Sequence, residues 1–587
     1  MRTPTIWGSY RRPLTAGVVL ALFTLLIGLF FSKILFFPQQ YHIPYDLHDY
    51  HYSLAHQIYS ELKRGNLPFW DPYTYSGMPL AGNIQAQLFY WPTLLLLKLS
   101  DWIYGSFPYR MLEYQVISHY LLAASGTFLL ARSFNLTLSS AVLTGIIYTF
   151  GGFLASMTQH LGLINGAAWI PWIFFLVKRY FDTKRLACVA ASGVALAMVI
   201  LAGFPALIIA VFLYLGIISL VVVSYHTLMY GLRTGLRCLV STIILLSLAI
   251  SLSAVQLLPA FEANHYSSAS QHHELAGLVG MEREGFITLL IPGFYGVGTD
   301  QYWGNQEHTH SYHYLGVASL ILCLICLVTV RHKDMMLIIA LTAFSLFWTL
   351  GEGFYVSKII WRLMPSSIRG GIYPFCGKLF FDLGVALMAG VGLDTLRNTF
   401  FDLRETSRIR AVLLSVAGVL VGFAVASLAF HYLAQNAEFG TAHRIILIRI
   451  YQGFNLFIIL SMIYSVLIVC RLRKRLSWGL VAWCVLLMTF AELHTFGAGK
   501  RFNTAVSNKQ SRLGPETLDG RRYPLDFLKS DPDYQGGKYM RIDTWRRQYG
   551  DRFSSCGDAL QAPIRVLWFS HLLCRFTFCG LLPVAAD

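Results

Sequence analysis

Long apolar runs separated by polar segments dominate the chain. A helix needs roughly 20 apolar residues to cross a bilayer, and inside lipid it pairs its backbone groups internally. The runs lie near residues 13–37, 112–131, 137–156, 161–180, 186–203, 206–224, 238–260, 312–330, 335–351, 375–395, 411–431, 444–470 and 477–495. They predict an all-α polytopic membrane protein with about 13 transmembrane helices.

Basic residues cluster in alternate loops between these runs. If the N-terminus is cytoplasmic, every cluster falls on the cytoplasmic side, as the positive-inside rule expects. The clusters are Arg132; Lys178, Arg179, Lys184 and Arg185; Arg233 and Arg237; Arg331 and Lys333; Arg397, Arg404, Arg408 and Arg410; and Arg471, Arg473, Lys474 and Arg475. We therefore expect a multi-pass protein of the cytoplasmic (inner) membrane, with an extracytoplasmic C-terminus.

The composition excludes a soluble enzyme, because only 13% of residues are charged, against about 25% in soluble proteins. The net charge of +16 is of the kind that nucleic-acid-binding proteins carry. Here the positive-inside rule accounts for the basic clusters. We expect the lipid bilayer, and no nucleic acid, among the partners.

Most polar and aromatic residues fall in the segments predicted to face outward. These are loops 38–110, 261–311 and 352–374 and the tail 496–587. We expect a transmembrane domain over 1–495, with its active site in loop 38–110, and a small α/β extracytoplasmic segment over 496–587. No Walker A, GxGxxG or HExxH motif is present in the sequence, so ATP hydrolysis and nicotinamide chemistry have no visible site.

Two acidic residues, Asp46 and Asp49, lie immediately outside the first run. The spacing of Leu54, Ile58 and Leu62 predicts an amphipathic helix over 49–63, on the outer membrane face. One interpretation is that a carboxylate caps this helix. The other is a general base at the membrane surface, with Asp46 slightly favoured.

Histidines gather in two outer loops and raise the alternative of a divalent metal. The first loop holds His42, His48, His51 and His56, and the second holds His308, His310 and His313. Neither spacing matches a common ligand set. We expect no certain cofactor and keep a divalent metal as an open alternative.

The segment 65–92 combines turn residues with aromatic and amide side chains. Trp70 and Tyr73 suit a membrane interface or a sugar ring, and Asp71 lies in the turn between them. Asn83, Gln85 and Gln87 offer hydrogen bonds to a hydroxyl-rich ligand. The run 88–100 is too short to span, which predicts a re-entrant or interfacial helix.

The stretch GNLPFWDPYTYSGMPLAGNIQAQLFYWP resembles the signature loop of the YfhO family of bacterial membrane proteins. The resemblance continues at 252–270, where Gln256, Pro259 and Glu262 form a Q-x-x-P-x-x-E pattern, and at 364–396. It covers nearly all of residues 1–550. Proteins of this family resemble the GT-C glycosyltransferases, which use polyprenyl-phosphate-linked sugars.

The resemblance implies an inverting sugar transfer at the outer leaflet. Asp46 or Asp49 would be the base, and Arg369 and Lys378 would hold the departing lipid phosphate. For both cations the alternative is ordinary interfacial snorkelling. For Lys378 we favour a structural pair with Asp382, one helical turn away. Glu262 would line the substrate cavity, or form a boundary hydrogen bond.

Two functions follow as hypotheses. The first is a membrane glycosyltransferase that moves a sugar from a polyprenyl-phosphate donor to a cell-envelope glycan or lipid acceptor. The second is a transporter or flippase of a lipid-linked or anionic solute. The odd span count, the large one-sided loops and the lack of paired broken helices speak against the second.

The tail is expected to be incomplete. Residues 538–545 predict a strand. From about residue 553 the composition changes, and Cys556, Cys574 and Cys579 crowd the last stretch. We interpret this stretch as out of frame or truncated, which puts activity in doubt. The competing interpretation is a short hydrophobic tail that associates with the membrane.

Overall fold

The computed structural model describes residues 13–72, 77–266, 283–296, 302–304, 309–330, 332–351, 355, 358–359, 362, 373–398, 403–436, 441–500 and 503–506. The chain divides into two compact units. The first comprises Met1–Asp71 and Met78–Arg521, and the second Pro72–Gly77 and Arg522–Asp587. All helices and strands described below belong to the first unit. The predicted strand 538–545 and the suspect tail lie outside the described residues.

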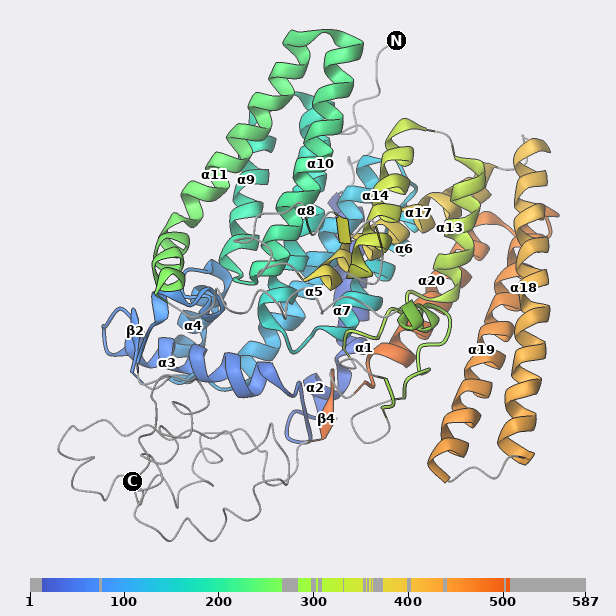
Figure 1. Ribbon diagram of the computed structural model, residues 1–587, viewed down its shortest axis with the longest axis horizontal. Coiled ribbons are helices and arrows are strands. Elements are labelled where there is room, and N and C mark those ends of the chain that lie inside the picture. Colours follow the sequence, from blue (N-terminus) through green and yellow to red (C-terminus); the bar gives the residue numbers. More distant parts are fainter. Residues whose placement is uncertain are drawn as a thin grey trace, which may run out of the picture. The chain divides into compact units, whose positions relative to one another are not determined.

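Helices coincide with all of the predicted apolar runs (Figure 1). They are α1 (Pro13–Phe30), α5 (Arg110–Ser133), α6 (Leu138–Phe150) with α7 (Gly152–Ser156), α8 (Leu161–Thr183), α9 (Leu186–Leu201), α10 (Pro205–Tyr230), α11 (Leu232–His265), α13 (Val317–Thr329), α14 (Lys333–Thr349), α17 (Gly377–Asn398), α18 (Leu403–Asn436), α19 (Thr441–Leu472) and α20 (Trp478–Gly497).

Shorter elements build the loops that were predicted to face outward. The helices are α2 (Ser32–Phe36), a π-helical turn η2 (Leu47–His51), α3 (Tyr52–Lys63), α4 (Trp91–Tyr104), and the 3-10 turns η3 (Leu80–Gly82), η4 (Ile84–Ala86), η6 (Arg283–Leu289) and η9 (Pro374–Cys376). The strands β1 (Tyr41–His42) and β4 (Ala505–Val506) pair antiparallel, as do β2 (Trp70–Asp71) and β3 (Met78–Pro79).

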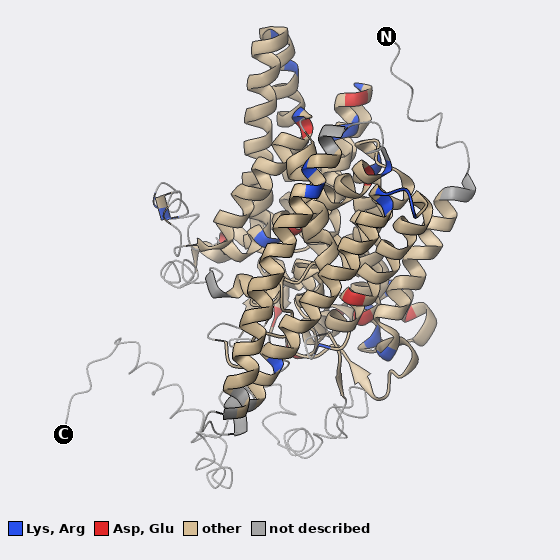
Figure 2. Ribbon diagram, turned by 90° about the vertical axis from the view of Figure 1, so that its right-hand side faces the viewer, with Lys and Arg blue, Asp and Glu red and all other residues tan. Residues whose placement is uncertain are grey.

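The chain is a multi-pass α-helical membrane protein. Within the described residues, 8 helices are long and apolar enough to cross a membrane. Charged residues are sparse along these helices (Figure 2). The helices differ in burial, because 89% of the best window in α6–α7 is buried but only 11% of that in α18. Helices such as α18 therefore present apolar side chains to lipid.

Strand pairing supports an odd number of spans. Tyr41 of β1, after α1, pairs with Val506 of β4, after α20. The end of α1 also meets α20 directly, because the rings of Phe30 and His494 pack edge to face. The ends of the first and last spans therefore lie on the same side of the bundle. An even count would place them on opposite sides.

The loops predicted to be cytoplasmic also lie together. Arg471, at the end of α19, donates to the carbonyls of Leu396 and Arg397 at the end of α17. The Thr137 N–H, before α6, donates to Asp394 of α17. These contacts join helix ends that the charge pattern assigns to one side.

A break between α6 and α7 shapes the centre of the bundle. The predicted span 137–156 turns sharply at Gly151, and the Gly152 N–H donates to the Tyr314 carbonyl at 2.8 Å. A Cβ at Gly152 would lie 2.6 Å from Asp382 Oδ2, so only glycine permits this approach. The segment 151–160 that follows, here called the junction segment, leads from the core to α8.

Candidate functional site

The predicted amphipathic helix is present, with a different first turn. Residues 47–51 form the π-helical turn η2, and α3 continues to Lys63. Leu54 and Ile58 are buried as predicted, whereas Leu62 is 38% exposed. Gly65, with a φ of 81°, follows the end of the helix. π-helical turns are rare and occur frequently at functional sites.

Asp46 does not cap this helix, so the capping interpretation is wrong for Asp46. It precedes η2 but makes no side-chain cap hydrogen bond. Its Oδ2 instead lies 3.1 Å from Nδ1 of His160, at the end of the junction segment. The Asp46 side chain is 52% exposed. The structure thus leaves this carboxylate partly accessible while it holds a specific partner.

His160 has a polar neighbour at each ring nitrogen. The Gln159 amide lies 3.3 Å from His160 Nε2, and Asp46 Oδ2 lies 3.1 Å from His160 Nδ1. Because an ionised carboxylate can only accept, Nδ1 donates to Asp46. The hydrogen bond from His160 is the main reason why the pKa of Asp46 is lower than its ordinary value. Asp46 is consequently ionised at neutral pH.

His51, the last residue of η2, lies behind this pair. It is buried, and desolvation lowers its pKa to about 4. It interacts electrostatically with both Asp46 and His160. Because His51 stays neutral at physiological pH, it places no positive charge beside the Asp46 carboxylate.

Asp49 has a different environment. It is 58% exposed and contacts the ring nitrogen Nδ1 of His48, the residue before it. The His48 ring packs against His42 and Tyr109. This contact is local, whereas Asp46 is held by a residue from another part of the chain.

The two charges predicted to pair, Lys378 and Asp382, lie deep in the bundle, each 2% exposed. Lys378 donates to the Ser156 hydroxyl at 3.3 Å and to the Tyr312 carbonyl. Asp382 accepts from the Phe153 N–H at 2.7 Å. They attract each other electrostatically, but among the described residues no salt bridge joins them. The predicted direct pair is therefore not formed, and each charge is instead hydrogen-bonded to the junction segment or its surroundings.

A second buried lysine, Lys500, lies just beyond α20. It is 7% exposed, and its Nζ lies 3.2 Å from the Pro292 carbonyl and 4.9 Å from the ring centroid of Tyr312. Burial lowers the pKa of Lys500 to about 8. Within the described part of the chain, no carboxylate forms a salt bridge with Lys500. A buried ammonium without a carboxylate is suited to an anionic ligand.

Asn503 ties this region to the junction segment. Its amide nitrogen donates to the carbonyls of Ala155 and Gly497, each at 2.7 Å. Its oxygen accepts from the Thr158 hydroxyl at 2.6 Å. The junction segment thus connects the partner of Asp46 with the neighbourhood of both lysines.

The predicted sugar-binding residues separate into different environments. Trp70 is 57% exposed on β2, and Asp71 beside it is buried. Asn83 accepts from the Gln85 N–H and donates to the Tyr50 hydroxyl at 3.1 Å. Gln85 is half-buried. Tyr73 lies outside the described residues, as does Arg369.

The expectation that Gln87 offers hydrogen bonds to a ligand is wrong, because its side chain is buried and occupied. Gln87 has a φ of 57°, which turns its amide inward. The amide nitrogen donates to the Ala202 carbonyl, and the oxygen accepts from Asn165 and Thr93. This network anchors the loop to α8 and α9.

The two polar residues of the Q-x-x-P-x-x-E segment lie in different environments. Gln256 is buried and donates to the Ala81 carbonyl at 2.7 Å, so the end of α11 holds η3 in place. Glu262, six residues further on, is exposed. The run 88–100 forms α4, a 14-residue helix with exposed Trp91, Leu95 and Trp102.

The metal alternative finds no ligand set in the described part of the chain. No group of three or more His, Cys, Asp or Glu side chains is placed there to hold an ion. His308 lies outside the described residues. Asp46, His51 and His160 are instead linked to one another as a hydrogen-bonded and electrostatic group.

His160, Lys500 and Asn503 were not among the site residues predicted from the sequence. His160 lies in a short loop between two apolar runs, and no sequence pattern distinguishes such a histidine from an ordinary loop residue. The pair Gly151–Gly152 within a predicted span was the available signal, because adjacent glycines in an apolar run indicate a break or a close approach.

Comparisons with known proteins found a likeness only among solved structures. No protein-family model matches the chain, and no curated protein matches it. Among solved structures, ArnT from Cupriavidus metallidurans bound to undecaprenyl phosphate is similar over 88% of this chain and 79% of that chain, with 12% identity and a TM-score of 0.39. A TM-score this low does not establish a common fold.

Proposed function

We propose that this protein is a membrane glycosyltransferase of the GT-C type. It would transfer a sugar from a polyprenyl-phosphate donor to a cell-envelope glycan or lipid on the outer face of the cytoplasmic membrane. The observation that carries the proposal is the Asp46–His160 pair, a partly exposed carboxylate fixed by a histidine beside the first span.

Asp46 is the proposed general base. It takes the proton of the acceptor hydroxyl while the hydroxyl oxygen forms a bond to the anomeric carbon of the sugar. The bond from that carbon to the phosphate oxygen breaks at the same time, and polyprenyl phosphate leaves. A positioned base typically contributes a factor of about 10² to 10⁴ to such a step. The single displacement inverts the anomeric centre.

Among the cationic side chains of the described residues, Lys500 is best suited to hold the departing phosphate. Lys378 is bonded inside the bundle, whereas Lys500 has a single carbonyl acceptor and an aromatic ring beside its ammonium. An arriving phosphate would replace the weak carbonyl contact with a charge-assisted hydrogen bond. Arg369, predicted from sequence for the same role, stays a candidate.

Exposed Trp70 is the proposed contact for a sugar or acceptor ring, because an indole face packs well against carbohydrate C–H groups. Asp71, Tyr73, Asn83, Gln85 and Glu262 stay candidates for substrate contacts. The Asn83 side chain also bonds to Tyr50 and to the Gln85 N–H, so it helps to hold this loop in shape.

The rival function is a transporter or flippase. A carrier needs a pathway through the bundle, but the junction segment fills its centre with bonded, buried groups. A transferase that works at one face has no such requirement. The packing of this segment therefore favours the enzyme.

Proteoliposomes containing the full chain distinguish the two functions. They would be loaded with polyprenyl-phosphate-linked sugar labelled in the sugar, and mixed with an envelope extract as acceptor. The proposal expects label in the acceptor and free polyprenyl phosphate in wild type, and neither product in Asp46→Asn. Label that crosses the bilayer while still attached to the lipid, without acceptor labelling, would contradict the proposal.

A further inference from the structure

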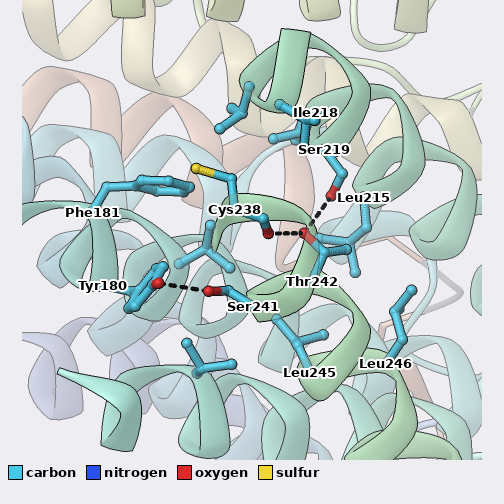
Figure 3. Close-up of a pocket in the computed structure, with 14 residues that line it drawn as sticks. Tyr180, Phe181, Leu215, Ile218, Ser219, Cys238, Ser241, Thr242, Leu245 and Leu246 are labelled. Carbon is cyan, nitrogen blue, oxygen red and sulfur yellow. Dashed lines mark hydrogen bonds between the residues drawn. The ribbon is translucent and has the colours of Figure 1, made fainter. Parts of the chain in front are cut away.

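An apolar pocket lies far from Asp46 in the chain, between α8, α9, α10 and α11. The cavity itself has a volume of about 40 Å³, which is room for a few methylene groups, and one side of it is open. Its walls are formed by aromatic and aliphatic side chains such as Phe181, Leu215 and Leu245 (Figure 3). We propose that this pocket takes a segment of the acyl chain of an anionic phospholipid, whose headgroup meets Lys184 while the rest of the chain lies along the open side.

The few polar groups in the pocket satisfy one another. The Ser241 hydroxyl lies 2.5 Å from the Tyr180 hydroxyl, and the Ser219 and Thr242 hydroxyls lie 3.1 Å apart (Figure 3). Because these hydroxyls are already paired, the pocket has little to offer a polar ligand. The remaining surface matches a hydrocarbon chain, which needs no hydrogen bonds.

Lys184 supplies the charge beside this apolar space. It ends α8 in the left-handed conformation, with a φ of 57°. Its Nζ lies 5.3 Å from the ring centroid of Phe181 and 5.9 Å from that of Tyr180, both of which line the pocket. The structure thus places a cation within reach of a headgroup whose chain enters the pocket.

This lysine carries positive charge that is not neutralised nearby. The neighbouring acid, Asp182, pairs with Lys178 at 2.7 Å, and no salt bridge joins Lys184 to an acid among the described residues. Arg185 follows it directly. Charge complementarity therefore favours an anionic lipid over a zwitterionic one.

The surrounding surface brings lipid to the open side of the pocket. Only 33% of the apolar window of α10 and 28% of that of α11 is buried. Leu220 and Val240, next to pocket residues on these helices, are exposed. These faces are covered by the bilayer, so acyl chains are the molecules that surround the opening.

Native mass spectrometry of the purified full chain tests this proposal, with phosphatidylglycerol and phosphatidylcholine offered in equal amounts. We expect wild type to retain phosphatidylglycerol preferentially. Lys184→Gln should lower that retention about fivefold, the effect of one lysine on attraction to an anionic lipid. Arg185→Gln is the matched control. It removes one positive charge at the adjacent residue but leaves the contacts of Lys184 with Tyr180 and Phe181 in place, so it should have a smaller effect.

A second variant tests the apolar part. Val222→Trp fills the pocket and should lower retention of both lipids, while the melting temperature without added lipid shows that the variant folds. Equal losses in Lys184→Gln and Arg185→Gln would overturn the proposal. So would unchanged retention in Val222→Trp, or equal retention of the two lipids by wild type.

Discussion

Two sets of charged groups in this protein are built from similar side chains but occupy opposite environments. Asp46 meets His160 beside the end of the first span and stays 52% exposed. Asp382 and Lys378 lie in the core, each 2% exposed, with their bonds directed at the junction segment. Both carboxylates hold the same ten-residue stretch, one at its end and one near its start.

The difference supports the proposal that Asp46, and not Asp382, is the reactive carboxylate. A buried charge is costly, and it is stabilised only while its hydrogen bonds stay in place. Asp382 therefore cannot exchange its partners for a substrate without loss of stability. Asp46 keeps open lone pairs beside solvent and has one defined donor, so it can accept a proton from an arriving hydroxyl.

The largest expected effect comes from Asp46→Asn. The amide keeps the shape but cannot accept a proton, so sugar transfer should fall by about 10² to 10⁴. Initial rates of transfer in proteoliposomes measure this loss, with the melting temperature as a control for folding. If the variant keeps wild-type activity at a normal protein level, Asp46 is not the base.

In the core, Lys378→Met should act on stability and not directly on chemistry. It leaves the buried Asp382 carboxylate without a nearby cation, a change that typically costs about 3–5 kcal/mol. Thermal unfolding in detergent measures the loss. The double variant Lys378→Met with Asp382→Leu should recover part of it, because two apolar residues leave no buried charge. If Lys378→Met alone is as stable as wild type, the core charges are not needed for stability, and the contrast between the two sites fails.

The pH profile of transfer tests the role of His160. Its hydrogen bond lowers the pKa of Asp46, so the base stays ionised to a lower pH. His160→Leu removes the bond and raises the pKa of Asp46, which should move the acid limb of the activity profile to higher pH. His160→Asn, whose amide can still donate, should move it less. If the acid limb of both variants stays at the wild-type pH, His160 has no such role.

The smallest effect is expected for Asp49→Asn. Asp49 is exposed and its partner is the adjacent His48, and exposed ion pairs contribute about 0–1 kcal/mol. Transfer rates should stay close to wild type. A loss as large as that of Asp46→Asn would move the base to Asp49 and reverse the assignment within this loop.

The apolar runs were sufficient to predict the helices, because a span must be apolar over its whole length whatever it packs against. The position of acidic residues immediately outside the first run likewise made Asp46 and Asp49 candidates, and the role of Asp46 as base stays a prediction. The partner of Asp46 was out of reach, because His160 is adjacent only after the chain turns at Gly151. Gln87 was misassigned for a related reason, since a left-handed backbone at one residue turns its amide from solvent into the core.

The most direct test of the account is a structure of the full chain bound to polyprenyl phosphate. The account predicts the phosphate within hydrogen-bonding distance of Lys500 Nζ, with the Asp46 carboxylate facing the same space and His160 still beside it. A phosphate bound at the opposite end of the helices, with Lys500 still on the Pro292 carbonyl, would contradict it.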